Sequence, residues 1–395
     1  MPAPEQQQHE PVVDFHCPQC SGETAFSAAD GGITCHYCGY HEAPQAAVVG
    51  KSAETFEFTV ATMAQASHGW GVEKHEVICQ KCGSKIVVEA DSLTTTCPFC
   101  QSNKVIQRKA PQDVLRPRFL IPFSISEDQA HDKTRAWLGK HWLTPKQLQR
   151  AASIADFNAM YLPYWTFDAQ ADARWQAEVG HVVTRKRRGK TVKEIVWRNE
   201  SGHVGHRFNN IRVSGSQRLS AKLMRQISDY DLSNLSEYDA AFLAGTQAIA
   251  YETGLDAAFA SARHAMRDQI KTRCQRQAST TRIRNFRMSL DYSDEAWRYI
   301  LLPVYVSTYY FQNEPYQLLI NGQSGTVAGQ RPVDWRKIIV AASIPLLLSV
   351  LLFFGQEFIQ RGDSLMFNWL AAVLFGLGIT IAVVLTFKAG EMSDG

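Results

Sequence analysis

The sequence lacks the short motifs that mark the common nucleotide-dependent and hydrolytic enzymes. It contains no G-x-S-x-G elbow, no H-E-x-x-H helix and no dinucleotide-binding fingerprint. The tract 189–191 resembles the end of a phosphate-binding loop, but Thr184 stands where that loop requires its first glycine. No other G-x-x-x-x-G-K-S/T occurs, so we expect neither an ATPase nor a helicase, and the leading expectation is a protein that is not an enzyme. A catalytic site assembled only by the folded central domain stays open as a weaker hypothesis.

An excess of charge is also missing. The 395 residues carry 41 Lys and Arg against 38 Asp and Glu, a formal net charge of +3. This balance indicates no partner by bulk electrostatics. A hydrophobic content of 45% in a chain of this length allows two or three packed units. Residues 1–13 are polar, lack the apolar core of a signal peptide, and are expected to be disordered.

Eight of the nine cysteines form two copies of one metal-site pattern. In each copy two C-x-x-C pairs are separated by 14 residues, and adding 62 to the first set of numbers gives the second. This spacing is typical of a zinc ribbon with four thiolate ligands around one ion. The predicted ligands are Cys17, Cys20, Cys35 and Cys38 in the first ribbon, and Cys79, Cys82, Cys97 and Cys100 in the second.

The alternatives for these cysteines are redox chemistry and disulfide bonds. A redox C-x-x-C normally stands alone ahead of a helix, whereas here the motifs come in pairs around short polar segments. Four thiolates close a tetrahedral site and leave no position for water or substrate, so we expect two structural Zn²⁺ ions. Gly39 and Gly83, which follow their C-x-x-C pairs, and Gly22 are expected at turns that need positive φ. Reduced zinc-ligand thiols indicate a reducing compartment.

Two long segments near the C-terminus lack charge altogether. Residues 338–354 and 365–387 contain no charged side chain, and crossing a bilayer takes about 20 apolar residues. We expect a transmembrane hairpin with helices over 335–355 and 365–387 and a tail over 388–395. The alternative is a buried helical pair in a soluble core. Basic residues flank the outer ends of the hairpin, which predicts an inner-membrane protein with both termini and most of the chain in the cytoplasm.

The chain between the ribbons and the hairpin reads as an α+β domain over 111–332. We expect helices over 126–140 and, broken near Gly254, over 238–272. Apolar strands are expected at 162–167 and 302–306, and Asn321-Gly322 predicts a hairpin. The Leu-Pro dipeptide in both strands favours a duplicated helix-plus-hairpin unit. The full prediction is a multidomain chain with a zinc ribbon at 14–42, a linker with a short helix at 43–75, a second ribbon at 76–108, this domain, and the hairpin.

Two basic regions are candidates for contact with anionic lipid or nucleic acid. The first lies between two strand-like stretches and comprises Arg185, Lys186, Arg187, Arg188 and Lys190. The second recurs every four residues on one helical face and comprises Arg263, Arg267 and Lys271. A solvated surface without a ligand is the alternative for both. Lipid gains weight for the first region because the hairpin would hold the domain near an anionic leaflet.

Several tracts resemble bacterial membrane proteins that carry zinc ribbons of the transcription-factor-IIB type. The resemblance covers roughly residues 66–337 and rests on HGWG at 68–71, CQKCG at 79–83, TCPFC at 96–100, RPR at 116–118, YLPYW at 161–165, RYILLPVY at 298–305 and NGQSG at 321–325. Such proteins are often labelled as relatives of the primosomal helicase protein N-prime, but this chain has no Walker A motif. Similar proteins are associated with SPFH (flotillin-like) and phage-shock-type envelope-stress proteins. The resemblance therefore implies such partners and carries over the eight cysteines as zinc ligands.

Together these patterns lead to two hypotheses of function. The first is a membrane-anchored cytoplasmic adaptor or scaffold that recruits protein partners, with no small-molecule substrate. The second is a nucleic-acid-binding zinc-ribbon protein tethered to the membrane. The second ribbon carries no strongly basic face, which favours the first hypothesis.

Overall fold

The computed structural model describes most of the chain. The described residues are 16–44, 46–50, 53, 55–57, 74–81, 83–89, 97–99, 102–110, 115–140, 142–145, 148, 157–187, 190–312, 314–358 and 364–393. The expected disorder of residues 1–13 lies outside them. So does most of the short helix expected in the linker, where the described residues include strand β4 (Phe56–Glu57).

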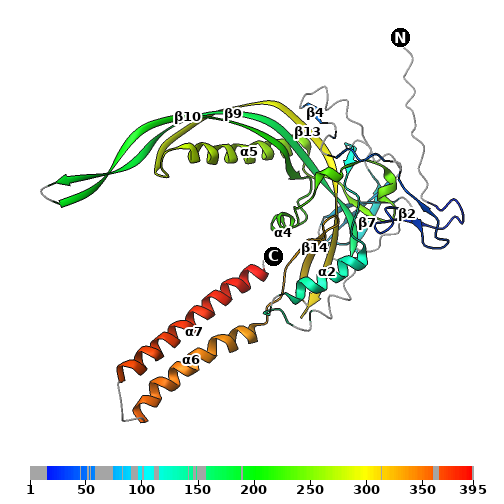
Figure 1. The fold of residues 1–395 in the computed structure, drawn as a ribbon. Helices are drawn as coiled ribbons and strands as arrows, with labels where there is room; N and C mark the ends of the chain where they lie inside the picture. The colour runs from blue at the N-terminus through cyan, green and yellow to red at the C-terminus, as the bar shows by residue number, and fades with distance from the viewer. Residues whose placement is uncertain are drawn as a thin grey trace.

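Three very long antiparallel strands dominate the molecule. They are β9 (Asn158–Arg187), β10 (Lys190–Ser214) and β13 (Ile283–Phe311), and β9 lies between the other two. A strand of 30 residues rises about 3.3 Å per residue, so β9 is roughly 100 Å long. The distal parts of these strands leave the central body as a curved arm (Figure 1).

Helix α5 (Leu255–Gln277) runs along one face of this arm (Figure 1). On β9 the side chains alternate, with Ala169, Ala171 and Ala173 buried, while Asp172 and Arg174 are exposed on the other face. These alanines share one core cluster with the buried residues of α5, including Ala258, Ala262 and Met266. Small side chains let the helix approach the sheet closely, and their alternation explains why only one face carries a helix.

The arm bends where both outer strands bulge. Strand β10 is irregular between Phe208 and Ile211, and β13 between Ser293 and Ala296, at the same level of β9. Asn210 and Asp294 adopt positive φ values of 57° and 51° there. Because a bulge adds a residue to one strand only, it increases the local twist and bends the strand.

The inner halves of the long strands form the central sheet together with shorter strands. Its order is β11-β8-β13-β9-β12-β6-β5-β7. The added strands are β5 (Lys74–Cys79), β6 (Lys85–Glu89), β7 (Val105–Lys109), β8 (Phe119–Leu120), β11 (Ser236–Glu237) and β12 (Gln247–Ile249). Strand β13 continues into a hairpin with β14 (Glu314–Asn321), which pairs with β15 (Val327–Gly329).

Two buried clusters cover the two faces of this sheet. Trp165, Phe167 and Leu301 belong to one cluster, which also contains the buried faces of α5 and of α2 (Glu127–Gly139). Leu162, Ile300 and Leu302 belong to the other, against α4 (Ala221–Gln226). Neighbouring residues of these strands are all buried and belong alternately to the two clusters, as in a strand that is covered on both faces.

The expected helices have mixed outcomes. Helix α2 begins after Ser126, whose side chain accepts from the Gln129 amide in a capping box, which confirms the predicted start. The second expected helix is only partly correct. Helix α5 begins after Gly254, whereas the preceding segment forms the 3-10 turn η3 (Ala240–Leu243) and strand β12. The short apolar runs there fit a helix or a strand equally well, and the sheet decides between them.

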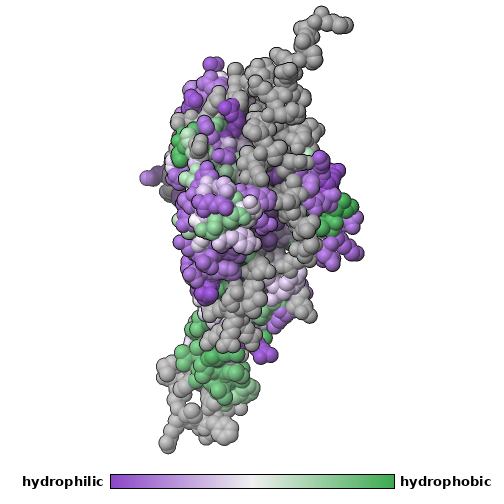
Figure 2. Space-filling model, turned by 90° about the vertical axis from the view of Figure 1, so that its right-hand side faces the viewer, coloured by the Kyte–Doolittle hydropathy of each residue, from purple (hydrophilic) through white to green (hydrophobic). Residues whose placement is uncertain are grey.

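Helices α6 (Trp335–Phe358) and α7 (Ser364–Ser393) form the C-terminal pair (Figure 1). Segments Trp335–Phe354 and Asn368–Gly390 are long and apolar enough to cross a membrane, and only 22% and 11% of the residues in the 18-residue apolar stretch of each are buried. A soluble core helix would be mostly buried, whereas these expose Leu, Val and Phe side chains that form the hydrophobic region at the bottom of Figure 2. Helix α7 also continues through most of the expected tail.

Candidate metal centre

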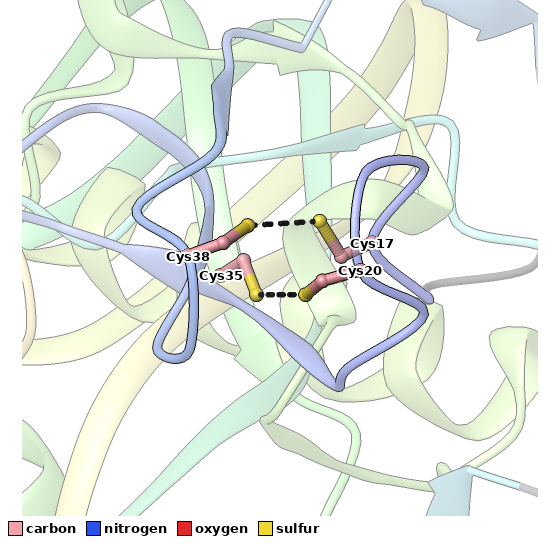
Figure 3. Close-up of side chains that lie close together, drawn as sticks. All are labelled: Cys17, Cys20, Cys35 and Cys38. Atoms are coloured by element: carbon pink, nitrogen blue, oxygen red, sulfur yellow. Dashed lines mark hydrogen bonds between the residues drawn. The ribbon is translucent and has the colours of Figure 1, made fainter.

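The first four cysteines converge on one point. Their sulfur atoms all lie within 4.8 Å of one another. Cys17 Sγ is 3.4 Å from Cys38 Sγ, and Cys20 Sγ is 3.5 Å from Cys35 Sγ, so each C-x-x-C pair faces the other (Figure 3). Four sulfur ligands in this arrangement fit a tetrahedral metal ion such as Zn²⁺. The predicted first set of ligands is therefore brought together.

Backbone hydrogen bonds shape each turn around its cysteines. The amide of Cys17 donates to the carbonyl of Gly22 at 2.7 Å, and the amide of Ser21 donates back to the carbonyl of Cys17 at 2.8 Å. The second turn repeats both bonds, from Cys35 to Tyr40 at 2.9 Å and from Gly39 to Cys35 at 3.0 Å. Each turn thus holds its two cysteines rigidly, with their sulfur atoms toward the other turn.

The fifth residue takes the left-handed conformation in the three C-x-x-C turns whose fifth residue the structure describes. Gly39 and Gly83 have φ of 74° and 70°, as expected, but in the first turn this place belongs to Ser21, with φ of 57°. The expectation for Gly22 was wrong. A Cβ on Gly22 would lie 2.6 Å from the Tyr37 ring, so this glycine provides space for packing.

The thiols of the first site do not titrate alike. A backbone hydrogen bond from Cys38 is the main cause that lowers the pKa of Cys35 to about 7. For Cys20 a backbone hydrogen bond from Gly22 acts to lower the pKa, but the neighbouring Cys35 and Cys38 thiols raise it to about 12. Four crowded thiolates repel one another, so a bound cation is what would let all of them ionise together.

The second set of cysteines begins its turns in the same way. The amide of Cys79 donates to Ser84 and the amide of Cys97 donates to Ser102, each at 2.9 Å, and Gly83 donates to Cys79 at 2.8 Å. The hydroxyl of Ser84 lies 3.2 Å from Cys97 Sγ, which brings the two turns into contact. The other two predicted ligands, Cys82 and Cys100, lie outside the described residues. No pattern in the sequence pointed to a role for Ser84.

The second cysteine region belongs to the central sheet. Strand β5 pairs with β6 and β7, and β6 also pairs with β12 of the central domain. Val77, Ile86 and Val88 form a small buried cluster between the turns. Main-chain hydrogen bonds therefore link this region to the central domain across the predicted boundary near residue 110.

The first ribbon is also attached to the body. Its strands β1 (Thr24–Ser27), β2 (Gly32–Cys35) and β3 (His41–Glu42) form a separate three-stranded sheet. The Phe26 ring packs on Phe242 of η3 at 5.2 Å, and the Phe26 amide donates to the carbonyl of Ala244 at 3.1 Å. These contacts fix the orientation of the first four-cysteine cluster relative to the central domain.

The two predicted basic regions occupy different parts of the arm. Arg185 and Lys186 lie exposed at the end of the β9–β10 hairpin. Of the other residues in that region, Arg187 is the last of β9, Lys190 is the first of β10, and Arg188 lies outside the described residues. The structure confirms the strand-like stretches on both sides of this region, which pair as the antiparallel strands β9 and β10.

The second basic region lies on α5, where its three residues differ. Arg263 forms a double hydrogen bond with Glu295, both at 2.9 Å, and its guanidinium also lies over the rings of Phe259 and Tyr292. Arg267 and Lys271 are exposed. Arg263 therefore stabilises the contact of α5 with β13, and its charge is already neutralised by a partner within the chain.

A hollow of about 660 Å³ lies on the arm, lined by Arg174, Trp175, Gln176, Ser201, Gly202, His203, Arg287, Met288 and Ser289. These residues include no carboxylate, so acid–base catalysis by a carboxyl group has no support there.

Comparison with known proteins gives a distant relative. The chain is 25% identical over 334 residues to the uncharacterized protein YdjG of Bacillus subtilis (strain 168), a match that covers 83% of this chain and 92% of the relative. No family model matches the chain, and no solved structure matches it. The chain is thus similar, along most of its length, to an uncharacterized protein.

Proposed function

We propose that the chain is a membrane-anchored adaptor that recruits protein partners to the inner face of the cytoplasmic membrane. The observation that carries this proposal is the combination of a four-thiol centre with two exposed apolar helices of membrane-spanning length. A site closed by four sulfur ligands stabilises a fold and leaves no open position for substrate. Its role is then to maintain a protein surface.

Two bound Zn²⁺ ions are part of this proposal. The repeated backbone hydrogen bonds at Cys79 and Cys97, with the contact of Ser84 and Cys97, support a second centre like the first. Each zinc compensates for the small core of a segment of roughly 30 residues, which cannot fold stably by itself. The two ribbons would present fixed surfaces because both are attached to the central domain.

In this proposal helices α6 and α7 anchor the adaptor in the membrane. With both termini in the cytoplasm, the ribbons, the sheet and the arm lie on one side of the membrane, as the flanking basic residues favour. The resemblance of the sequence to zinc-ribbon membrane proteins favours SPFH-type or envelope-stress proteins as partners. A protein that gathers such partners needs anchoring and rigid surfaces, and no catalytic group.

A cross-linked pull-down of the full-length protein from detergent-solubilised membranes tests this proposal. It is carried out with and without nuclease and analysed by mass spectrometry. A reproducible set of protein partners that survives nuclease supports the adaptor. Robust hydrolytic or redox activity of the purified protein, lost on substitution of a residue of the central domain, would contradict it.

The second candidate is a nucleic-acid-binding protein held at the membrane. The exposed basic residues at the end of the arm favour it, because phosphate contacts dominate nucleic-acid affinity. The pairing of Arg263 with Glu295 weakens it on α5. It predicts binding whose logarithm falls linearly with the logarithm of salt concentration, and partners that disappear from the pull-down after nuclease.

A further inference from the structure

The β9–β10 hairpin projects beyond strand β13 and helix α5, which cover the rest of the arm. Strand β13 begins at Ile283, opposite Val179, and α5 ends at Gln277. From Gly180 onward the described residues of β9 and β10 continue as two strands with neither a third strand nor a helix paired to them (Figure 1), and residues 279–282 contact only the start of this segment, at Gly180 and His181. We call this two-stranded segment, Gly180–Arg187 of β9 with Lys190–Trp197 of β10, the arm tip.

The arm tip exposes apolar side chains on both faces. Val182 and Ile195 lie opposite each other on one face and are each 45% exposed, and Val192 on the other face is 46% exposed. A two-stranded hairpin in water is only marginally stable, and exposed Val and Ile make it prone to association. Burial of these side chains in an apolar phase would therefore stabilise the arm tip.

The same segment carries a concentrated positive charge. Between Thr184 and Val196 the sequence has six basic residues and one acidic residue, Glu194. The Arg185 guanidinium lies 3.8 Å from the Glu194 carboxylate, and both side chains are exposed. Since solvent screens such a pair, it neutralises little of the charge. Basic residues alone would be enough to keep the strand edges apart, and that role requires no exposed Val or Ile.

The arm tip extends to the side on which the apolar helices lie. In Figure 1 the arm and the α6–α7 pair both leave the central body toward the left of the view. The eight residues Gly180–Arg187 of the tip span roughly 26 Å at the usual strand rise, which gives the segment a long reach. When α6 and α7 cross a bilayer, the tip extends toward the leaflet through which they enter.

From these observations we propose that the arm tip is a second membrane contact, in which basic side chains bind anionic lipid headgroups and Val182, Val192 and Ile195 enter the interface. The proposal rests on the anchorage by α6 and α7. In this proposal the arm is a second point of attachment, and it fixes the tilt of the cytoplasmic body over the membrane. The cytoplasmic leaflet is negatively charged, and its attraction amounts to about a fivefold change in binding per basic residue near the surface.

Trypsin cleavage at the arm tip tests the proposal, because its basic residues are the cleavage sites. The full-length protein is placed in lipid nanodiscs of phosphatidylcholine alone or mixed with phosphatidylglycerol, and cleavage at 185–190 is followed by mass spectrometry relative to cleavage elsewhere. We expect cleavage in anionic discs to slow by at least about fivefold. An equal rate in both kinds of disc, for protein that remains in them, overturns the contact and leaves the anchorage standing.

Variants that keep the cleavage sites separate the parts of the contact. Lys193→Glu should remove most of the protection, and Val182→Thr with Ile195→Thr should weaken it while preserving strand propensity. The matched control is Arg207→Glu, an exposed basic residue on the proximal part of β10, which should leave protection unchanged. Equal effects of Lys193→Glu and Arg207→Glu would contradict a contact confined to the tip.

Two further outcomes reject the proposal for different reasons. If the protein separates from the nanodiscs on a size-exclusion column at high salt, α6 and α7 do not anchor it in the bilayer. If duplex DNA protects the tip in detergent and anionic lipid does not, the tip binds nucleic acid. Zinc content of each variant, equal to that of the wild type, shows that the fold is intact.

Discussion

Leu162 of β9 and Leu302 of β13 lie directly opposite each other in the antiparallel register, and both side chains are buried, at 1% and 0% exposure. A proline follows each leucine, at Pro163 and Pro303. The carbonyl of Pro163 accepts from Gly215 at 2.8 Å, and that of Pro303 accepts from Gly322 at 2.9 Å. The same Leu-Pro and glycine arrangement thus occurs twice around one local two-fold axis.

A duplicated helix-plus-hairpin unit would give this arrangement. Helix α2 precedes the β9–β10 hairpin, and α5 precedes the β13–β14 hairpin. In each unit the glycine comes directly after the returning strand, beside the proline of the outgoing strand. In both units a Cβ on the glycine would lie within 3.0 Å of the proline ring, so the repeated arrangement agrees with the duplication that the sequence pattern favours.

The two glycines should therefore tolerate alanine to different degrees. A Cβ on Gly322 would lie 2.7 Å from the Phe123 ring and 2.8 Å from Pro303, whereas at Gly215 the closest atoms are at 3.0–3.1 Å. We expect Gly322→Ala to lower the free energy of unfolding by about 1–3 kcal/mol, as overpacking does. Gly215→Ala should cost less. Chemical denaturation measures both changes.

The matched control for these variants is Gly205→Ala on β10, where the nearest atom would lie 4.0 Å away. It should be neutral or slightly stabilising, because alanine restricts the unfolded chain more than glycine does. If Gly205→Ala destabilised the protein as much as Gly322→Ala, packing against Pro303 would not be the reason for the glycine.

The metal-site turns predict a stabilising substitution. Ser21 occupies the left-handed position that Gly39 and Gly83 occupy in two of the other turns. Replacing it with glycine relieves backbone strain of the order of 1 kcal/mol. Ser21→Gly should slow zinc release to a competing chelator by severalfold, and Gly39→Ala should accelerate it. Faster release from Ser21→Gly would show that the Ser21 side chain has a role of its own.

Zinc stoichiometry tests the ligand assignment. Cys35→Ser should remove one zinc of two by disrupting the first centre, and Cys97→Ser should remove the other by disrupting the second. The two losses should add in the double variant, because the centres lie in different sheets. Metal analysis of the purified proteins gives the counts. A Cys97→Ser protein that retained both ions would refute the assignment of the second centre.

A buried arginine holds the bend of the arm. Arg298 is 3% exposed and donates to the carboxylate of Asp168 at 3.3 Å, to the side chain of Asn210 and to the carbonyl of Ala53. Arg298→Leu leaves these acceptors without their partner and should cost about 3 kcal/mol of stability. Arg298→Leu combined with Asp168→Ala should cost less than the sum of the two single variants. Strict additivity in this denaturation cycle would rule out the pairing.

The sequence predicted the elements that depend on local chemistry. The Ser126 cap, the Asn321-Gly322 turn, the first four-cysteine cluster and the two apolar helices were all correctly placed. Each follows from side chains close in sequence or from spacing alone. Residues 238–253 were misread as helix, because only pairing of β12 with β6 and β9 decides the conformation there.

The great length of the arm strands could not be predicted either. Alternating alanines on β9 look weakly apolar in sequence and become a core face only because α5 packs on them. The bulges at Asn210 and Asp294 and the burial of Arg298 likewise depend on contacts between residues far apart in the chain. Long-range packing therefore determines the shape of the arm, which the local pattern leaves open.

The measurement that tests the account most directly compares the membrane fractions of two bacterial strains, each of which expresses one full-length version of the chain. One is the wild type, and the other carries Cys35→Ser and Cys97→Ser, which keep α6 and α7 but disrupt both metal centres. The account predicts a set of otherwise soluble proteins that reach the membrane only with the wild type and stay there after nuclease. Identical membrane fractions from the two strains, with both chains present in equal amounts, would contradict it.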